Sequence, residues 1–273
     1  MSEKVGGSSG ILATLYRQRG LIEVLVGREL KARYRGTFLG YFWSLLNPLL
    51  LLSVYTLIFT LVIPARVPSR APYPLFLFAG LLPWLFASGS LLDAAIVLPD
   101  NGPLLRKVVF PPEVFPAVTV LSHLLHHVLA LPVLVAGIAA GAVLLGGPIP
   151  WTLVLLPLVI ALWLVAVAGA SLAVAALAVH FRDLKDLLHS LLQLVFFMTP
   201  IVYAPELVPE GPLRRIVLAN PLTPLVTLYR TVAVEGTVPG AATWAWAAVT
   251  AVVCWFAGTW IFARLRETLA EIV

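Results

Sequence analysis

Residues 151–179 read WTLVLLPLVIALWLVAVAGASLAVAALAV, a stretch of 29 residues without a charged side chain. A helix needs about 20 apolar residues to cross the hydrocarbon core of a bilayer, so this stretch predicts a membrane-spanning helix. The whole chain has the same character: of its 273 residues, 60% are hydrophobic and 11% are charged, and the mean hydropathy is +0.99. Soluble domains carry about 25% charged residues. The composition therefore predicts an integral membrane protein.

Similar apolar runs lie on both sides of this stretch. They cover residues 38–63, 74–98, 114–145 and 242–263, with a shorter run at 187–203. The segment 204–241 is apolar in part but contains six prolines, and proline interrupts helices. We predict an all-α fold with six transmembrane helices. We also predict that 204–241 forms re-entrant helices at the outer side of the membrane, before the last span.

The distribution of basic residues predicts the orientation of the chain. Seven lie in residues 1–37, and two each lie in the loops near 106 and 182 and in the C-terminal tail, whereas five lie on the other side. Because Lys and Arg are retained in the cytoplasm, both termini are predicted to be cytoplasmic. The same rule explains the net charge of +5 without nucleic-acid binding. The single cysteine, Cys254, excludes an intramolecular disulfide.

The start of the chain and two further segments are predicted to lie outside the spans. The polar beginning predicts a flexible tail over 1–14 and no cleavable signal peptide. In 15–35 the apolar residues recur every four positions, at Ile22, Val26, Leu30 and Tyr34. This pattern predicts an amphipathic helix in the cytoplasmic membrane interface, ahead of a six-span domain over 36–273. The alternative is a solvated start to the first span. In 100–113 a short two-sided pattern ends at paired prolines and predicts a docking helix for a soluble partner, with an ordinary loop as the alternative.

No motif for nucleotide hydrolysis is present in the chain. A phosphate-binding loop ends in Gly-Lys-Ser or Gly-Lys-Thr, but the four lysines are followed by Val, Ala, Val and Asp. We therefore expect that the chain is not an enzyme, and that any ATP hydrolysis belongs to a separate subunit.

An intramembrane serine protease of the rhomboid type is the alternative from the enzyme class. Phe86-Ala-Ser-Gly89 resembles the Gly-x-Ser-Gly of such proteases but lacks the leading glycine. The candidate bases are His123, His126 and His127. Two of these histidines share a helical face, but no Cys or acidic residue is nearby in sequence to complete a metal site, so we predict no metal.

Several motifs in order along the chain resemble one known family. They are RELKARYRGTFLGYFW (28–43), LNPL (46–49), GLLPW (80–84), LRKVVFPPE (105–113), FRD (181–183), TPIVY (199–203), NPLTP (220–224) and LYR (228–230). Together they resemble the membrane permease of type-2 ABC exporters, which move lipid-linked O-antigen, capsule or teichoic acid. The resemblance covers nearly the whole chain.

This resemblance implies a homodimer bound to two separate ATPase subunits in the bacterial inner membrane. It implies that ATP and magnesium bind to the partner subunit, that this chain holds no cofactor, and that an O-antigen-like polymer passes along the dimer axis. It assigns ATPase coupling to Arg28, Lys31, Arg33, Arg35, Leu105, Arg106, Lys107, Val108, Arg182 and Asp183. It assigns the outer gate to Pro200, Tyr203, Asn220, Pro221, Tyr229 and Arg230.

Aromatic residues of the first predicted span are candidates for a sugar path. Sugars stack their apolar faces on aromatic rings, and the candidates here are Tyr41, Trp43, Tyr55 and Phe59. The alternative is that Tyr41 and Trp43 anchor the helix at the membrane interface and that Tyr55 and Phe59 pack against other helices.

Overall fold

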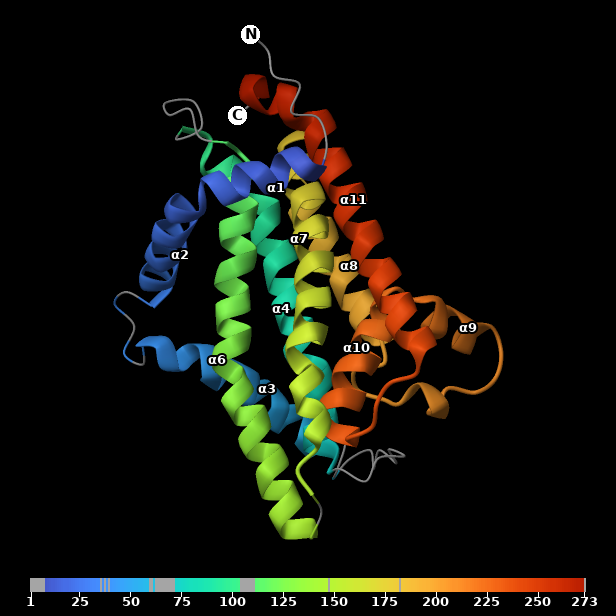
Figure 1. Cartoon of the computed structure of the whole chain (residues 1–273). Coiled ribbons are helices and arrows are strands. Elements are labelled where there is room, and N and C mark those ends of the chain that lie inside the picture. Colours follow the sequence, from blue (N-terminus) through green and yellow to red (C-terminus); the bar gives the residue numbers. More distant parts are fainter. Residues whose placement is uncertain are drawn as a thin grey trace.

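The computed structural model describes residues 8–34, 36, 38, 40–58, 61, 72–103, 111–146, 148–181 and 183–272. Within these residues the regular elements are all helices, which confirms the predicted all-α class. Figure 1 shows a bundle of long helices with shorter helices around it. The ends of the bundle are called upper and lower below, as they lie in Figure 1.

Four helices are long and apolar enough to cross a membrane. They are α4 (Tyr73–Asp100), α6 (Val114–Leu145), α7 (Leu156–His180), which follows the 3-10 turn η3 (Trp151–Leu155), and α11 (Ala241–Ile272). They match four of the six predicted spans. Figure 1 shows that they run side by side between the two ends of the bundle.

Helix α4 lies at the centre of the bundle. In its most apolar stretch 67% of the residues are buried, against 22% to 33% in the other three long helices. The others therefore turn apolar surface outward, as helices in contact with lipid do. Helices α7 and α11 approach most closely at two glycines, because a Cβ on Gly258 would overlap the carbonyl oxygen of Gly169. Small residues at such crossings let helix backbones approach each other in membranes.

The remaining two predicted spans correspond to shorter helices. Helix α3 (Trp43–Leu57) follows the 3-10 turn η1 (Gly40–Phe42), and it runs obliquely across the lower half of the bundle in Figure 1. Helix α8 (Leu184–Met198) also has 15 residues, about 22 Å at 1.5 Å per residue. The hydrocarbon core is about 30 Å thick. Six complete crossings are therefore not established by these helices.

Helix α8 ends earlier than the predicted run 187–203. Thr199 follows the helix with an extended backbone, ψ 135°. The residue before a proline is pushed out of the helical region by the proline ring, and Pro200 follows Thr199. The proline therefore sets this helix end, and residues 199–203 of the apolar run lie outside α8.

The N-terminal region is more ordered than predicted. Helix α1 (Ser8–Arg17) covers part of the predicted flexible tail 1–14, so that prediction fails from Ser8 onward. The reason is tertiary: Ile11 is buried against α4 and α11, in a cluster with Ala94 and Phe262. Residues 1–7 lie outside the described part of the chain.

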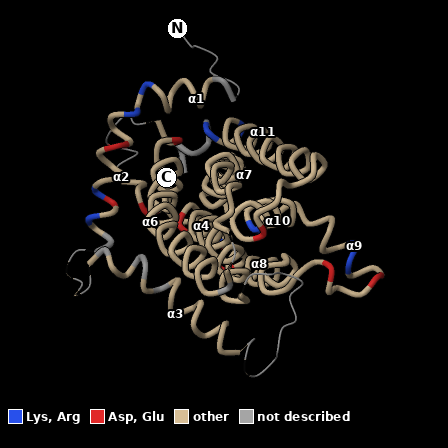
Figure 2. The backbone as a smooth tube through the Cα atoms, turned by 60° about the horizontal axis from the view of Figure 1, so that its bottom comes forward, with Lys and Arg blue, Asp and Glu red and all other residues tan. Residues whose placement is uncertain are grey.

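Helix α2 (Arg19–Tyr34) buries part of its predicted apolar face. Ile22 and Val26 are buried against Val114 and Val118 at the start of α6. Figure 1 shows α1 across the upper end of the bundle and α2 descending beside α6. Figure 2 shows charged residues along α2 and in the region of α9, at the edge of the bundle.

The proline-rich segment 204–241 forms several short helices. They are the 3-10 turn η4 (Pro205–Leu207), α9 (Pro212–Ala219), α10 (Leu222–Arg230) and a π-helical turn, η5 (Thr231–Glu235). Helix α10 is largely buried and packs against α4, α7 and α11, whereas α9 projects from the side of the bundle in Figure 1. A broken helical segment was predicted here, and its place relative to a membrane remains a prediction.

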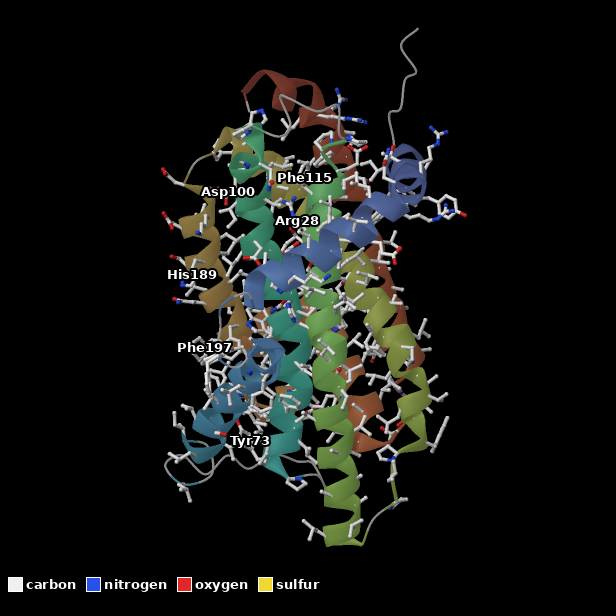
Figure 3. All side chains as sticks on the ribbon, turned by 90° about the vertical axis from the view of Figure 1, so that its left-hand side faces the viewer. Arg28, Tyr73, Asp100, Phe115, His189 and Phe197 are labelled. Carbon is white, nitrogen blue, oxygen red and sulfur yellow. The ribbon has the colours of Figure 1, made fainter. Side chains whose placement is uncertain are left out.

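Both ends of the described chain meet at the upper end of the bundle. Helix α1, the end of α4, the start of α6 and the last turns of α11 lie there in Figure 1. Figure 3 shows Tyr73 and Asp100 at opposite ends of α4, with Asp100 at this upper end. This arrangement fits an even number of crossings, as the predicted topology requires.

Candidate functional site

A groove lined by aromatic and polar side chains lies between α3, α4 and α8, and we call it the aromatic groove. Its volume is about 370 Å³. Its lining residues are Leu51, Tyr55, Leu81, Trp84, Leu85, Ser88, Leu92, His189, Leu192, Gln193, Phe196 and Phe197. Figure 3 shows His189 and Phe197 along the outer side of α8.

The rings of the aromatic groove form a connected series. The ring centroid of Phe196 lies 6.0 Å from that of Tyr55, 5.6 Å from that of Trp84 and 5.1 Å from that of Phe197. Beside them the side chains of Gln193 and His189 are hydrogen-bonded at 3.2 Å. Flat apolar rings next to polar groups are what a carbohydrate site needs, since specificity requires a few placed polar groups in an apolar lining.

The structure describes the side chains of only two of the four residues predicted for the sugar path. Tyr55 lines the aromatic groove, whereas Trp43 is exposed and does not line it. The side chain of Tyr41 and all of Phe59 lie outside the described part of the chain. Sequence reasoning missed Trp84 and the residues of α8. For the residues of α8, the sequence did contain a signal. His189, Gln193 and Phe196 are spaced so that they lie on one face of a helix, next to Phe197.

A second arrangement lies around Arg230, which is buried at the end of α10. Its Nε donates a hydrogen bond to the carbonyl oxygen of Phe76 at 3.2 Å. Its Nη1 and Nη2 donate to the carbonyl oxygens of Pro200 and Ile201, at 3.0 and 2.9 Å. One guanidinium thus connects α10, α4 and the turn after α8. We call this arrangement the Arg230 clamp.

The surroundings of the Arg230 clamp hold the guanidinium in place. Its central carbon lies 3.5 Å from the centroid of the Phe76 ring, in a cation–π contact. Gly80 leaves the necessary room, because a Cβ there would lie 2.6 Å from Nη2 of Arg230. Burial lowers the pKa of Arg230 to about 9, partly opposed by Glu235 and Glu206. The group therefore stays charged at neutral pH, and its hydrogen bonds offset the cost of burying that charge.

The other predicted gate residues are divided between two places. Near the Arg230 clamp, Asn220 donates to Oγ1 of Thr199 at 2.8 Å, and the Tyr203 hydroxyl donates to the carbonyl oxygen of Phe197 at 2.9 Å. Pro200 contributes its carbonyl to the clamp, and Pro221 is exposed just before α10. Tyr229 points elsewhere, since its hydroxyl lies 3.2 Å from Nε2 of His127 on α6.

The predicted coupling residues are described only in part. Arg28, Lys31 and Asp183 are exposed. Arg35, Leu105, Arg106, Lys107, Val108 and Arg182 lie outside the described residues, as does the side chain of Arg33. Glu113, at the end of the predicted docking segment, is fully buried, and its Oε1 lies 3.5 Å from Nη1 of Arg266 on α11.

The geometry does not support a serine protease. The hydroxyl of Ser88 donates to the carbonyl oxygen of Trp84 in its own helix, at 2.9 Å. Nε2 of His123 lies 2.7 Å from Asp93. His127 faces the Leu82 carbonyl and Tyr229. A nucleophile needs its base within hydrogen-bonding reach, and the described contacts of Ser88, His123 and His127 contain no such pair.

Comparison with known proteins gives consistent matches along the chain. The family described as "ABC-2 type transporter" matches residues 20–234. An "O-antigen export system permease protein RfbA" from Myxococcus xanthus is 41% identical over 266 residues, which is 96% of this chain and 99% of the relative. A protein of the same description from Klebsiella pneumoniae is 30% identical over 256 residues, covering 93% of this chain and 95% of the relative.

Proposed function

The chain belongs to the ABC-2 type transporter family, and from this premise we propose that it exports an O-antigen-like, lipid-linked polysaccharide across the bacterial inner membrane. The family is one of transporter membrane subunits, so the alternative of a rhomboid-type protease is wrong. The observation that carries the proposed substrate is the 41% identity to an O-antigen export permease over nearly the full length of both chains.

The working unit is proposed to be a homodimer with two ATP-binding subunits, which bind ATP and magnesium. The absence of a phosphate-binding loop from the sequence supports a separate ATPase. The exposed apolar residues of α3 and α8 are proposed to face the second copy of this chain. They include Leu50, Val54, Leu57, Leu187, Leu191 and Leu194.

The upper end of the bundle is proposed to face the cytoplasm and the ATPase. The predicted excess of basic residues on that side supports this orientation. There, α2 with Lys31 and the segment 100–113 would contact the partner. The buried Glu113 would carry displacements of that segment to α11 through its ion pair with Arg266.

The polymer path is proposed to follow the aromatic groove. Tyr55, Phe196 and Phe197 supply flat faces for stacking, and His189 and Gln193 supply hydrogen-bonding groups. The groove is open at its side, so a polymer can slide along it without being enclosed by a single chain. The Arg230 clamp would set the position of α10 and of the turn after α8 at the exit.

Deletion of the encoding gene in the native bacterium tests this function. Lipid-linked polymer should accumulate inside the cell, and surface O-antigen should disappear while capsule is unchanged. Affinity purification of the tagged chain from native membranes should recover an ATPase in equal amount. Unchanged surface O-antigen in the deletion strain, or ATP hydrolysis by the chain purified alone, would contradict the proposal.

A further inference from the structure

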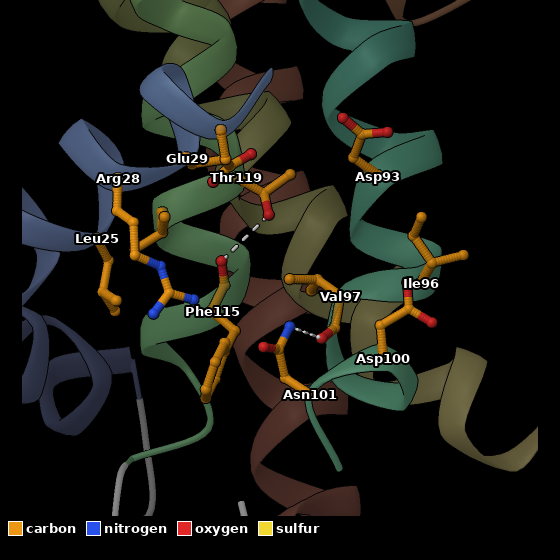
Figure 4. Close-up of a pocket in the computed structure, with 12 residues that line it drawn as sticks. Leu25, Arg28, Glu29, Asp93, Ile96, Val97, Asp100, Asn101, Phe115 and Thr119 are labelled. Atoms are coloured by element: carbon orange, nitrogen blue, oxygen red, sulfur yellow. Dashed lines mark hydrogen bonds between the residues drawn. The ribbon is translucent and has the colours of Figure 1, made fainter. Parts of the chain in front are cut away.

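A pocket near the upper end of the bundle lies between α2, α4 and α6, and we call it the interfacial pocket (Figure 4). Its volume is about 400 Å³, within the range of small-molecule sites. Its apolar wall consists of Leu25, Ile96, Val97, Phe115 and Val118. Its charged residues are Arg28, Glu29, Asp93 and Asp100.

Two polar contacts hold the walls of the interfacial pocket together. The hydroxyl of Ser122 on α6 donates to Oε2 of Glu29 on α2 at 3.1 Å. The next residue, His123, lies 2.7 Å from Asp93 on α4. Gly89 on α4 provides room for this histidine, since a Cβ there would lie 2.6 Å from the imidazole ring. Adjacent residues of α6 thus fix both α2 and α4, and the pocket is a built feature.

Two opposite charges of the pocket have no ion-pair partner in the part of the chain that the structure describes. Within the described residues, neither Arg28 nor Asp100 forms an ion pair. Figure 4 shows the Arg28 guanidinium reaching from α2 toward Phe115 and Asn101. The amide of Asn101 is already used, because its Nδ2 donates to the carbonyl oxygen of Val97 at 2.8 Å. A guanidinium and a carboxylate therefore line the pocket without an ion-pair partner among the described residues.

We propose that the interfacial pocket binds the headgroup of a zwitterionic phospholipid such as phosphatidylethanolamine. The Arg28 guanidinium donates hydrogen bonds to the phosphate, as Arg does with particular effectiveness. The carboxylate of Asp100 accepts from the ammonium, and the apolar wall contacts the glycerol and the first carbons of the acyl chains.

The charge of the pocket favours a zwitterionic headgroup over an anionic one. Among the described residues, three carboxylates and one guanidinium line it, so a headgroup with only negative charge would meet net repulsion from these groups. Its position favours a lipid over a soluble ligand. The pocket lies where α2 packs on the start of α6 and beside the end of α4, two helices long and apolar enough to cross a membrane. The ends of membrane-spanning helices lie near the lipid headgroups. The inference concerns the chain in its membrane and is independent of the exported polymer.

A headgroup series tests this inference without any variant. The full chain is purified, exchanged into an equimolar mixture of phosphatidylethanolamine, phosphatidylcholine and phosphatidylglycerol with identical acyl chains, and its retained lipids are quantified. Phosphatidylethanolamine should be enriched over phosphatidylglycerol by about fivefold to tenfold, since its charges match both sides of the pocket. Phosphatidylcholine should fall between them, because it keeps the charge but lacks ammonium N–H donors. Equal retention of all three lipids, or a preference for phosphatidylglycerol, would overturn the inference.

Two pairs of variants locate the preference at the pocket. Arg28→Gln and Asp100→Asn should each reduce the enrichment to the input ratio. The matched controls Arg17→Gln and Asp186→Asn change the same charges at exposed positions outside the pocket and should keep it. Size-exclusion profiles check that each variant is folded. An enrichment that survives in folded Arg28→Gln or folded Asp100→Asn would place the lipid elsewhere and overturn the assignment.

Discussion

The guanidinium of Arg230 lies over the ring of Phe76, 3.5 Å from its centroid, and its Nε also donates to the backbone carbonyl of the same residue at 3.2 Å. These two residues are 154 positions apart in the sequence. Their contact joins the buried helix α10 to the central helix α4. It is therefore one of the hydrogen bonds that connect the proline-rich segment to the core of the bundle.

Replacing Arg230 by Met should destabilise the protein strongly. The variant removes the charge and leaves three carbonyl oxygens without their donor, each of which costs about 1–3 kcal/mol when buried. The free energy of unfolding in detergent should fall by about 3 kcal/mol or more. The control is Arg214→Met, which affects an exposed ion pair with Glu210 and should cost less than about 1 kcal/mol. Equal stability of the two variants would refute the role of the clamp.

A methyl group at Gly80 should disturb the same clamp from the other side. In Gly80→Ala the new Cβ would lie 2.6 Å from Nη2 of Arg230 and 3.3 Å from the carbonyl oxygen of Ile201. We expect a loss of about 1–3 kcal/mol, the usual cost of overpacking a filled interior. Thermal unfolding measures it. The control Gly27→Ala lies on α2 with open space around the new Cβ, and it should be neutral or stabilising by up to about 1 kcal/mol.

The aromatic groove predicts a loss of export without a loss of fold. The double variant Tyr55→Leu with Phe197→Leu keeps apolar side chains but removes two flat faces from α3 and α8. Surface O-antigen should decrease, while membrane abundance and ATPase binding remain as in the wild type. Phe256→Leu on α11 is the control, because this ring is exposed outside the groove. A decrease in folded protein with the same loss of export would instead indicate a packing role.

The long spans were predictable from the sequence because hydropathy depends only on composition along a local window. The end of α8 could have been located in the same way, since Thr199 precedes Pro200 and the restriction on that residue is local, although the apolar run itself continues to residue 203. The helix at Ser8–Arg17 was not, because Ile11 is buried by residues of α4 and α11 that are distant in sequence. The same limit applies to the sites. Arg230 was singled out, but nothing local indicates Phe76 and Gly80 as its neighbours.

The aromatic groove is a second case in which some residues could be identified from the local sequence and others could not. Tyr55 was a candidate because it is an aromatic residue of the first predicted span. Trp84 and Phe196 come from two other helices, and their distance of 5.6 Å between ring centroids is a result of tertiary packing. Periodicity within one helix identifies the residues that share a face of that helix. It does not show which face of another helix packs against them.

The segment 100–113 gives a prediction from sequence alone, since Leu105 and Val108 lie outside the described residues. Changing both to Asp places charges on the proposed docking face. Export should fall while ATP hydrolysis by the assembled complex continues, so the ratio of ATP hydrolysed to polymer exported should rise. Unchanged export in a normally assembled complex would show that this face does not couple ATP hydrolysis to polymer export.

The ion pair of Glu113 and Arg266 predicts a non-additive result. Glu113 is completely buried, and within the described residues its carboxylate makes no hydrogen bond, so Arg266 at 3.5 Å is its compensating charge. Arg266→Gln leaves that carboxylate buried and unpaired and should cost about 3–5 kcal/mol. Glu113→Gln together with Arg266→Gln removes both charges, so the double variant should be more stable than Arg266→Gln alone. Thermal unfolding of the single and double variants measures the coupling, with exposed Arg264→Gln as the control. If the costs of the two single variants simply add in the double variant, the two groups do not interact, and Glu113 cannot carry displacements of the docking segment to α11 through this pair.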